Sequence, residues 1–168
     1  AGDRYRRGRG RGEDVRAGRV RAEAQKQDFE GPSGVVPMAE EDKVAFINDI
    51  REALYASKIV AYAQGFNEIT EAAKVYDWKI DLAAVARIWR GGCIIRAKFL
   101  NRISDAFENG EANVSLLFAP YFKDAIETAE RSWRRVVSRA ITFGIPVPVF
   151  ASSLEYFDGL RSPRLPAA

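Results

Sequence analysis

Residues 45–73 read AFINDIREALYASKIVAYAQGFNEITEAA, and this stretch decides the fold because its apolar residues recur at spacings of three and four. The recurring residues are Ala45, Phe46, Ile50, Leu54, Ile59, Val60, Ala63, Phe66, Ile69 and Ala73. Such spacing places side chains on one face of an α-helix. Asp42 stands just before the pattern, and Tyr76-Asp77-Trp78 follows it. We therefore expect one helix of about thirty residues with a single apolar face.

The chain after this helix continues with helical patterns. Asp81 has the side chain of a good N-cap for a helix over residues 82–89, with Ile80 as its apolar lead-in. Beyond Gly91-Gly92, apolar residues recur at helical spacing as far as Phe107. Asn109-Gly110 then supplies a stop signal, because both residues tolerate the left-handed conformation at helix ends.

Two more helices are expected near the C-terminus. Residues 121–143 carry a third apolar pattern at helical spacing, and Gly144 fits the left-handed cap position after it. After the extended Pro146–Pro148 junction, residues 149–160 resemble a short helix capped near Gly159. No segment alternates apolar and polar residues for long enough to predict a strand. The fold class is therefore all-α, a helical bundle.

The pair Gly91-Gly92 interrupts helical sequence on both sides, although glycine disfavours a helix. Glycines before a helix can hold a phosphate group, but here no strand or third glycine precedes the helix. The favoured interpretation is a tight junction at which two helices pack closely. For the adjacent Cys93, a small buried apolar role is favoured over that of a nucleophile, because the chain has no histidine to activate a thiol.

The positive charge of the chain is concentrated at its start. Residues 1–21 hold eight arginines and three acidic residues, a local charge of +5, which leaves −2 for the remainder. Repeated arginine and glycine predict a disordered start, and Gly31–Gly34 with Pro37 predicts a linker. We expect residues 1–37 to be start and linker and residues 38–168 to form the helical domain. A tail without function is favoured over an RNA-binding one.

Composition excludes several classes of protein. With no histidine and one cysteine, the chain lacks the usual residues of zinc sites, catalytic triads and intrachain disulfides. No apolar run is long enough for a membrane span, and no secretory signal precedes the domain. We expect a cytoplasmic protein with no metal site and no membrane partner.

Some charged and aromatic residues admit two interpretations each. Four arginines lie around the glycine pair, at Arg87, Arg90, Arg96 and Arg102. They could form a binding site for an anion, or they could be solvated or form ion pairs with acids such as Asp81, Asp105 and Glu108. Solvation or ion pairing is the favoured interpretation. Arg134-Arg135 admits the same two interpretations. We expect Trp89 and Trp133 to be anchors in the core or at an interface. The carboxylates of Glu40-Glu41 and Glu68-Glu71 are expected to be solvated.

About three quarters of the chain resembles one enzyme family in colinear order. The matching motifs are Phe46–Ile59, Ala61–Phe66, Ile88–Arg96, Ser132–Arg135, Gly144–Pro148, Tyr156–Arg161 and Pro163–Ala167. Together they resemble the C-terminal helical domain of the decarboxylating 6-phosphogluconate dehydrogenases. The resemblance implies an oxidoreductase of the pentose phosphate pathway and of gluconate utilization. Such an enzyme uses NADP to convert 6-phosphogluconate to ribulose 5-phosphate, CO2 and NADPH.

The same resemblance limits what this chain is expected to do. In the family a separate N-terminal Rossmann domain binds NADP, the catalytic lysine and glutamate lie upstream, and the helical domain builds a homodimer. A C-terminal tail with an arginine and a histidine reaches the partner's substrate phosphate. The sequence has no counterpart of these motifs, so we assign no catalytic, cofactor-binding, substrate-binding or metal-binding residue.

A fragment truncated at both ends is therefore expected to be inactive alone. As an alternative, the chain is a non-catalytic helical dimerisation module. In both cases a homodimer is the expected assembly, and nucleic acid is not an expected partner.

Overall fold

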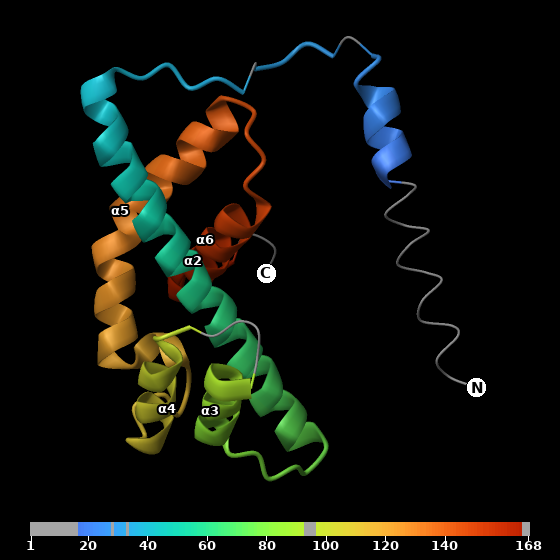
Figure 1. The fold of residues 1–168 in the computed structure, drawn as a ribbon. Helices are drawn as coiled ribbons and strands as arrows, with labels where there is room; N and C mark the ends of the chain where they lie inside the picture. Colours follow the sequence, from blue (N-terminus) through green and yellow to red (C-terminus); the bar gives the residue numbers. More distant parts are fainter. Residues whose placement is uncertain (1–16, 28, 33, 93–96, 166–168) are drawn as a thin grey trace. The chain divides into compact units, whose positions relative to one another are not determined.

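The computed structural model describes residues 17–27, 29–32, 34–92 and 97–165, which fall into two units divided between Ser33 and Gly34. The first unit contains a helix over residues 17–24 (Figure 1). This helix lies within residues 1–37, which are predicted from the sequence to be start and linker. The second unit contains all the other helices. The arginine- and glycine-rich residues 1–16 lie outside the described part of the chain.

Helix α2, Glu40–Val75, is the long helix that the sequence predicts. It begins two residues before Asp42, at an Ala39 N-cap whose side chain makes no capping hydrogen bond. Glu40, Glu41 and Asp42 instead occupy the first turn, where negative charge stabilises the exposed N–H groups of a helix. The helix ends at Val75 with Tyr76 as its C-cap, and the next residue, Asp77, has a left-handed backbone with φ 52°.

Helix α3, Leu82–Gly92, and helix α4, Leu100–Glu108, pack on one another. The predicted N-cap of α3 is confirmed, because Asp81 Oδ1 accepts a hydrogen bond from Ala84 N at 3.0 Å. The stop after α4 is also confirmed, since Gly110 has φ 73°. Cys93 and the rest of segment 93–96 lie outside the described residues, so the prediction for this thiol stays a prediction.

The glycine-pair prediction is wrong. Gly91 and Gly92 form the last turn of α3 and are exposed, and a Cβ built on either would meet no described atom within 4 Å. A close helix junction would place such an atom against a neighbour. The pair is therefore part of a helix end and not a site of tight packing.

Helix α5, Pro120–Thr142, and helix α6, Pro148–Arg161, complete the bundle, and a short 3-10 helix, η1, Leu116–Phe118, precedes α5. Both helices begin with a proline, whose missing N–H costs nothing at the first helical position. Gly144 adopts the predicted left-handed cap with φ 69°. Gly159 does not cap α6, which continues to Arg161 and has Ser162 as its C-cap.

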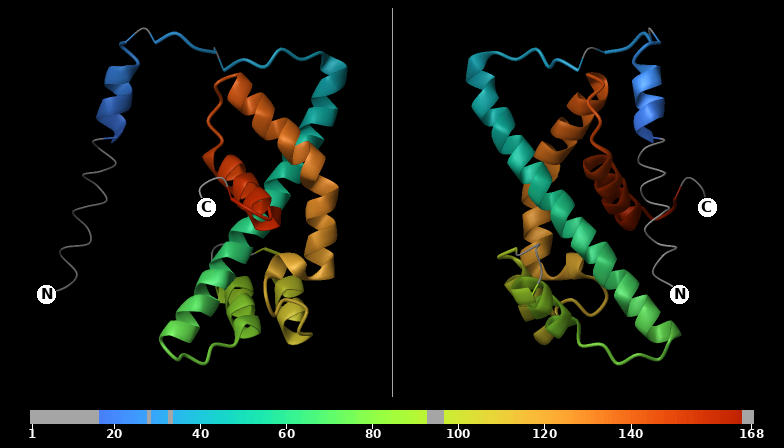
Figure 2. Two further views of the ribbon diagram at one scale, coloured as in Figure 1. Left: turned by 180° about the vertical axis from the view of Figure 1, so that it is seen from behind. Right: turned by 45° about the vertical axis from the view of Figure 1, so that its right-hand side comes forward.

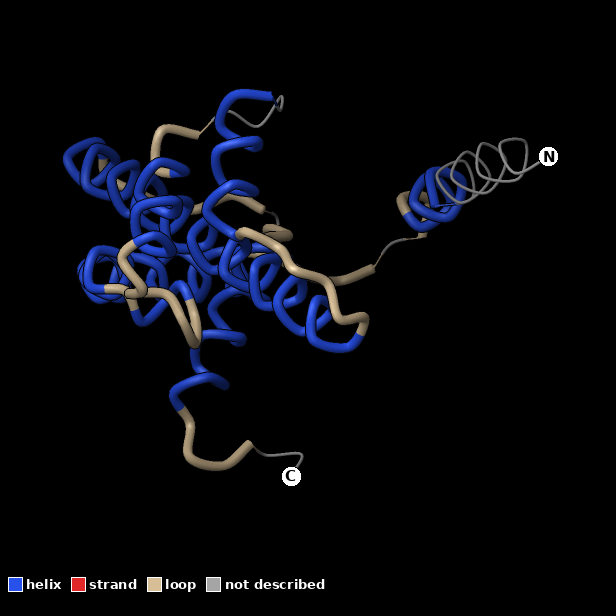
Figure 3. The backbone as a smooth tube through the Cα atoms, turned by 90° about the horizontal axis from the view of Figure 1, so that it is seen from below, coloured by secondary structure: helices blue, strands red, loops and turns tan. Residues whose placement is uncertain are grey.

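The second unit is built on α2, which contacts α5, α6 and η1, and α5 crosses it in both views of Figure 2. The tube in Figure 3 shows helices and loops and no strand in the described residues, as the all-α prediction requires. The core contains the aromatic side chains Phe66, Phe122 and Trp133, which are at most 1% exposed. Among the described helices, none has both the length and the apolar character needed to cross a membrane.

Candidate interaction surfaces on the long helix

The two adjacent arginines of α5 reach in different directions and hold α5 against its neighbours. Arg134 Nη1 donates to Asp158 Oδ2 of α6 at 3.0 Å and also pairs with Glu130. Arg135 donates from Nε and Nη2 to the Asp49 carboxylate of α2, at 2.8 and 2.5 Å. Hydrogen bonds from these guanidinium groups hold the pKa of Asp158 and of Asp49 below the ordinary aspartate value. The favoured ion-pair interpretation holds for both arginines.

The four arginines around the glycine pair do not act together. Arg87 bridges Asp81 and Glu108 and donates to Ser104 Oγ at 3.0 Å, as the ion-pair interpretation expects. Arg102 forms no ion pair with a described residue and lies over the Tyr121 ring at 5.3 Å. In the described part of the structure, Arg90 Nε is buried without a hydrogen-bond partner. Arg96 lies outside the described residues.

The tryptophans are packing residues. Trp133 is fully buried, and its Nε1 donates to the Phe150 carbonyl at 3.1 Å, so the buried polar atom is satisfied. Trp89 is half-buried, with its ring centroid 5.0 Å from that of Phe66 and 5.8 Å from that of Tyr62. These contacts confirm the anchor interpretation.

The predicted carboxylate pairs are solvated. Glu40, Glu41 and Glu68 are exposed on α2, and Glu71 pairs with Lys74 at 2.6 Å on the surface. Nothing in this arrangement supports acid–base chemistry, because that needs a carboxylate with a perturbed environment beside a reacting group.

Apolar residues lie on more than one face of α2, which differs from the single face that the sequence predicts. Its buried residues begin only at Ala53. Along the first half, Val44, Ile47, Ile50 and Leu54 are 68%, 57%, 39% and 54% exposed. We call these four residues the α2 stripe. An exposed apolar row of this kind on one helix is typical of a surface that another chain covers.

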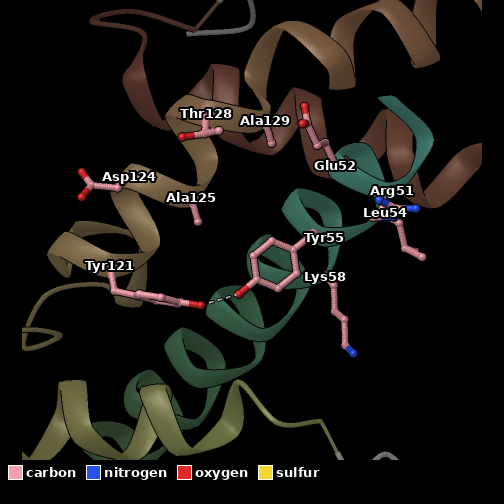
Figure 4. Close-up of a pocket in the computed structure, with 10 residues that line it drawn as sticks. All are labelled: Arg51, Glu52, Leu54, Tyr55, Lys58, Tyr121, Asp124, Ala125, Thr128 and Ala129. Carbon is pink, nitrogen blue, oxygen red and sulfur yellow. Dashed lines mark hydrogen bonds between the residues drawn. The ribbon is translucent and has the colours of Figure 1, made fainter. Parts of the chain in front are cut away.

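A groove of about 630 Å³ lies beside the stripe, between α2 and α5 (Figure 4). Leu54 belongs to both features, and the carboxylates Glu52 and Asp124 also line the groove. Tyr55 and Tyr121 also line the groove, and their hydroxyl oxygens lie 2.9 Å apart in a hydrogen bond. These tyrosines stand 66 positions apart, so no sequence pattern pairs them, and sequence reasoning missed this site.

The fold and these surfaces define an all-α helical domain. The family model for the C-terminal domain of 6-phosphogluconate dehydrogenase matches residues 14–168. The chain therefore belongs to the 6-phosphogluconate dehydrogenase family, to which the motifs around Trp89 and Trp133 point.

Curated relatives named decarboxylating 6-phosphogluconate dehydrogenase agree with this family. The Candida albicans protein is 48% identical over 88% of this chain and 28% of its own length. The mouse protein is 45% identical over 84% of this chain and 29% of its own length. This chain therefore spans less than a third of the relatives that it matches.

A solved structure shows the same fold. It is a Plasmodium falciparum 6-phosphogluconate dehydrogenase, described in its apo form and in complex with its cofactor NADP+ and its substrate 6-phosphogluconate. It superposes with a TM-score of 0.80 and is 38% identical over 88% of this chain and 31% of its own. Together with the family model, this match confirms the predicted C-terminal helical domain.

Proposed function

We propose that this chain supplies the C-terminal helical domain of an NADP-dependent decarboxylating 6-phosphogluconate dehydrogenase. In the whole enzyme, 6-phosphogluconate is converted to ribulose 5-phosphate, CO2 and NADPH. One observation carries the proposal: the match to the family domain runs over residues 14–168. The expected cytoplasmic location belongs to the same proposal.

By itself the chain is expected to be inactive. Its sequence contains neither a glycine-rich dinucleotide-binding motif nor a histidine. We therefore expect NADP to bind the whole enzyme and not this chain alone.

A direct assay tests the inactivity. Purified chain is mixed with NADP and 6-phosphogluconate, and absorbance at the NADPH band is followed, after circular dichroism has shown that the helices are folded. The preparation comes from a host that lacks its own 6-phosphogluconate dehydrogenase. We expect no NADPH above the rate without protein, and a rate proportional to the chain concentration would overturn this expectation.

The second candidate function is assembly, and the α2 stripe favours it. We propose that the stripe packs against the stripe of a second copy in an antiparallel arrangement. Val44 and Leu54 flank the inner pair Ile47 and Ile50 almost symmetrically, at distances of three and four residues. A two-fold axis near the middle of the stripe therefore brings apolar residues of one copy opposite apolar residues of the other, which a closed symmetric dimer requires.

Sedimentation equilibrium at micromolar concentration tests the dimer. Ile47→Glu places a charge at the centre of the stripe, and we expect it to weaken dimerisation at least about tenfold, since burying an unpaired carboxylate is costly. Val114→Glu is the matched control, because Val114 is 79% exposed and lies outside the stripe. A monomeric wild-type chain, or equal weakening by both variants, would contradict the proposal.

A further inference from the structure

A second hollow, of about 390 Å³, continues from the groove between α2 and α5. It shares Tyr55, Lys58 and Tyr121 with that groove, and its other side is lined by residues 97–99 and by Arg102 of α4. Its cationic and aromatic lining residues are Tyr55, Lys58, Lys98, Phe99, Arg102 and Tyr121. We call this hollow the basic pocket.

Aromatic rings hold two of the pocket's cations in place. Lys58 Nζ lies 5.0 Å from the centre of the Phe99 ring, and the Phe99 ring meets the Tyr55 ring edge-on at 6.1 Å. On the other side, Arg102 lies over the Tyr121 ring at 5.3 Å. The hydrogen bond between Tyr55 and Tyr121 joins the two halves of this frame (Figure 4). Cation–π contacts therefore position charge around the pocket without neutralising it.

The charged residues that line the basic pocket itself are all positive, and the nearest lining carboxylates, Glu52 and Asp124, belong to the adjoining groove. Across the described part of the chain, Lys58, Lys98 and Arg102 form no ion pair, whereas Arg87, Arg134 and Arg135 all do.

Tyr55 and Tyr121 add an uncharged hydrogen-bond donor to the three cations of the pocket. Burial, together with the hydrogen bond to Tyr121, raises the pKa of Tyr55, so its hydroxyl keeps its proton at neutral pH. Because one hydroxyl of the pair donates to the other, the second O–H stays available to donate to a ligand. Three cations and one O–H donor match the oxygens of a polyanion.

We propose that the basic pocket binds a small polyanion of the phosphate class. Its volume is that of a small-molecule site. Two lysines supply point charges, and Arg102 supplies a guanidinium group that suits phosphate oxygens. This inference does not depend on the proposed enzyme or on the dimer, because binding to the pocket requires neither.

Inorganic pyrophosphate is the probe for the test. It is titrated into isotope-labelled chain at 150 mM sodium chloride, followed by two-dimensional NMR, and its affinity is measured by calorimetry. We expect saturable binding, with the largest shifts at the backbone amides of Lys58, Lys98 and Arg102. Screening at this ionic strength suppresses loose association with surface charges.

Single substitutions separate a built site from general attraction. Lys98→Gln and Arg102→Gln each remove one cation from an exposed position, so both variants are expected to fold, and each should weaken pyrophosphate binding at least about tenfold. Tyr121→Phe removes one hydroxyl and should weaken binding less. Lys79→Gln is the control, because Lys79 is exposed, does not line the pocket and gives the same change in net charge.

The result that overturns the proposal is equally specific. If the control weakens binding as much as the pocket variants do, the attraction is a property of the whole surface. Chemical-shift changes spread over lysines outside the pocket would also overturn the proposal. So would a titration that does not saturate by about 10 mM pyrophosphate, because the affinity would then be below that of an ordinary ligand site.

Discussion

Asp49 of α2 and Arg135 of α5 join the two longest helices through a two-point ion pair, although they stand 86 positions apart in the sequence. Arg135 Nη2 also donates to Ser132 Oγ at 3.0 Å. The Asp49 side chain is only 16% exposed, while that of Arg135 is 56% exposed. The planar guanidinium group of Arg135 meets the largely buried Asp49 carboxylate in a fixed geometry, and this pairing sets the position at which α2 and α5 cross.

This pair makes stability depend on acid pH. The pKa of Asp49 is lower in the folded protein than the ordinary value of 3.8, so its contribution is complete above that pH and is lost as pH falls through the folded value. We expect Asp49→Asn to lower the free energy of unfolding by about 1 kcal/mol at pH 7. Urea unfolding at pH 7 and at pH 3 should show this difference shrinking in acid.

Asp124→Asn provides the comparison for the Asp49 variant. Asp124 is exposed on α5 and has no ion pair within the described residues. Its substitution should change stability little at either pH. A loss for Asp49→Asn that is equal at pH 7 and pH 3 would show that the ion pair is not its source.

Truncation of the buried tryptophan should be the most destabilising change in the bundle. Trp133→Ala leaves a cavity in the core and should lower the free energy of unfolding by about 3–5 kcal/mol. Trp133→Phe fills most of the space but loses the hydrogen bond to the Phe150 carbonyl, so a smaller loss is expected. Urea denaturation measures both, and equal losses would mean that packing volume is not the cause.

The cap of α3 can be tested with two variants at one position. Asp81→Ala removes the acceptor for Ala84 N and should cost about 1 kcal/mol. Asp81→Asn keeps an acceptor at the same place and should cost much less, although it loses the long ion pair to Arg87. If thermal unfolding shows the same loss for both, charge and not capping explains the role of Asp81.

Because the glycine pair lies in a helix, replacing one of its glycines should increase the stability of the protein. Gly91→Ala should raise the free energy of unfolding by about 0.5–1 kcal/mol, because alanine favours helix and no described atom lies within 4 Å of a Cβ built on Gly91. Gly144→Ala should instead lower it by about 1 kcal/mol, because φ at Gly144 is 69°. Chemical denaturation of both variants tests the contrast, and a loss for Gly91→Ala would restore the tight-junction interpretation.

Local patterns in the sequence accounted for most of the helices. The spacing of apolar residues located α2 and α5, and the side chain of Asp81 located the start of α3, because both signals act within a few residues. Predictions at helix boundaries were weaker. Gly159 did not end α6, since a glycine stops a helix only where the chain needs a left-handed residue, and here the helix continues to Arg161.

The sequence by itself determined the all-α class, the main helices and the family, because periodicity, capping and motif order are all encoded locally. Only the tertiary structure decided which apolar face of α2 is buried and which stays exposed at Ile47 and Leu54. It also decided that Arg135 meets Asp49 and that Tyr55 meets Tyr121. These relationships depend on how α5 crosses α2, and the crossing is set by side chains that are distant in sequence and packed together only in the folded chain.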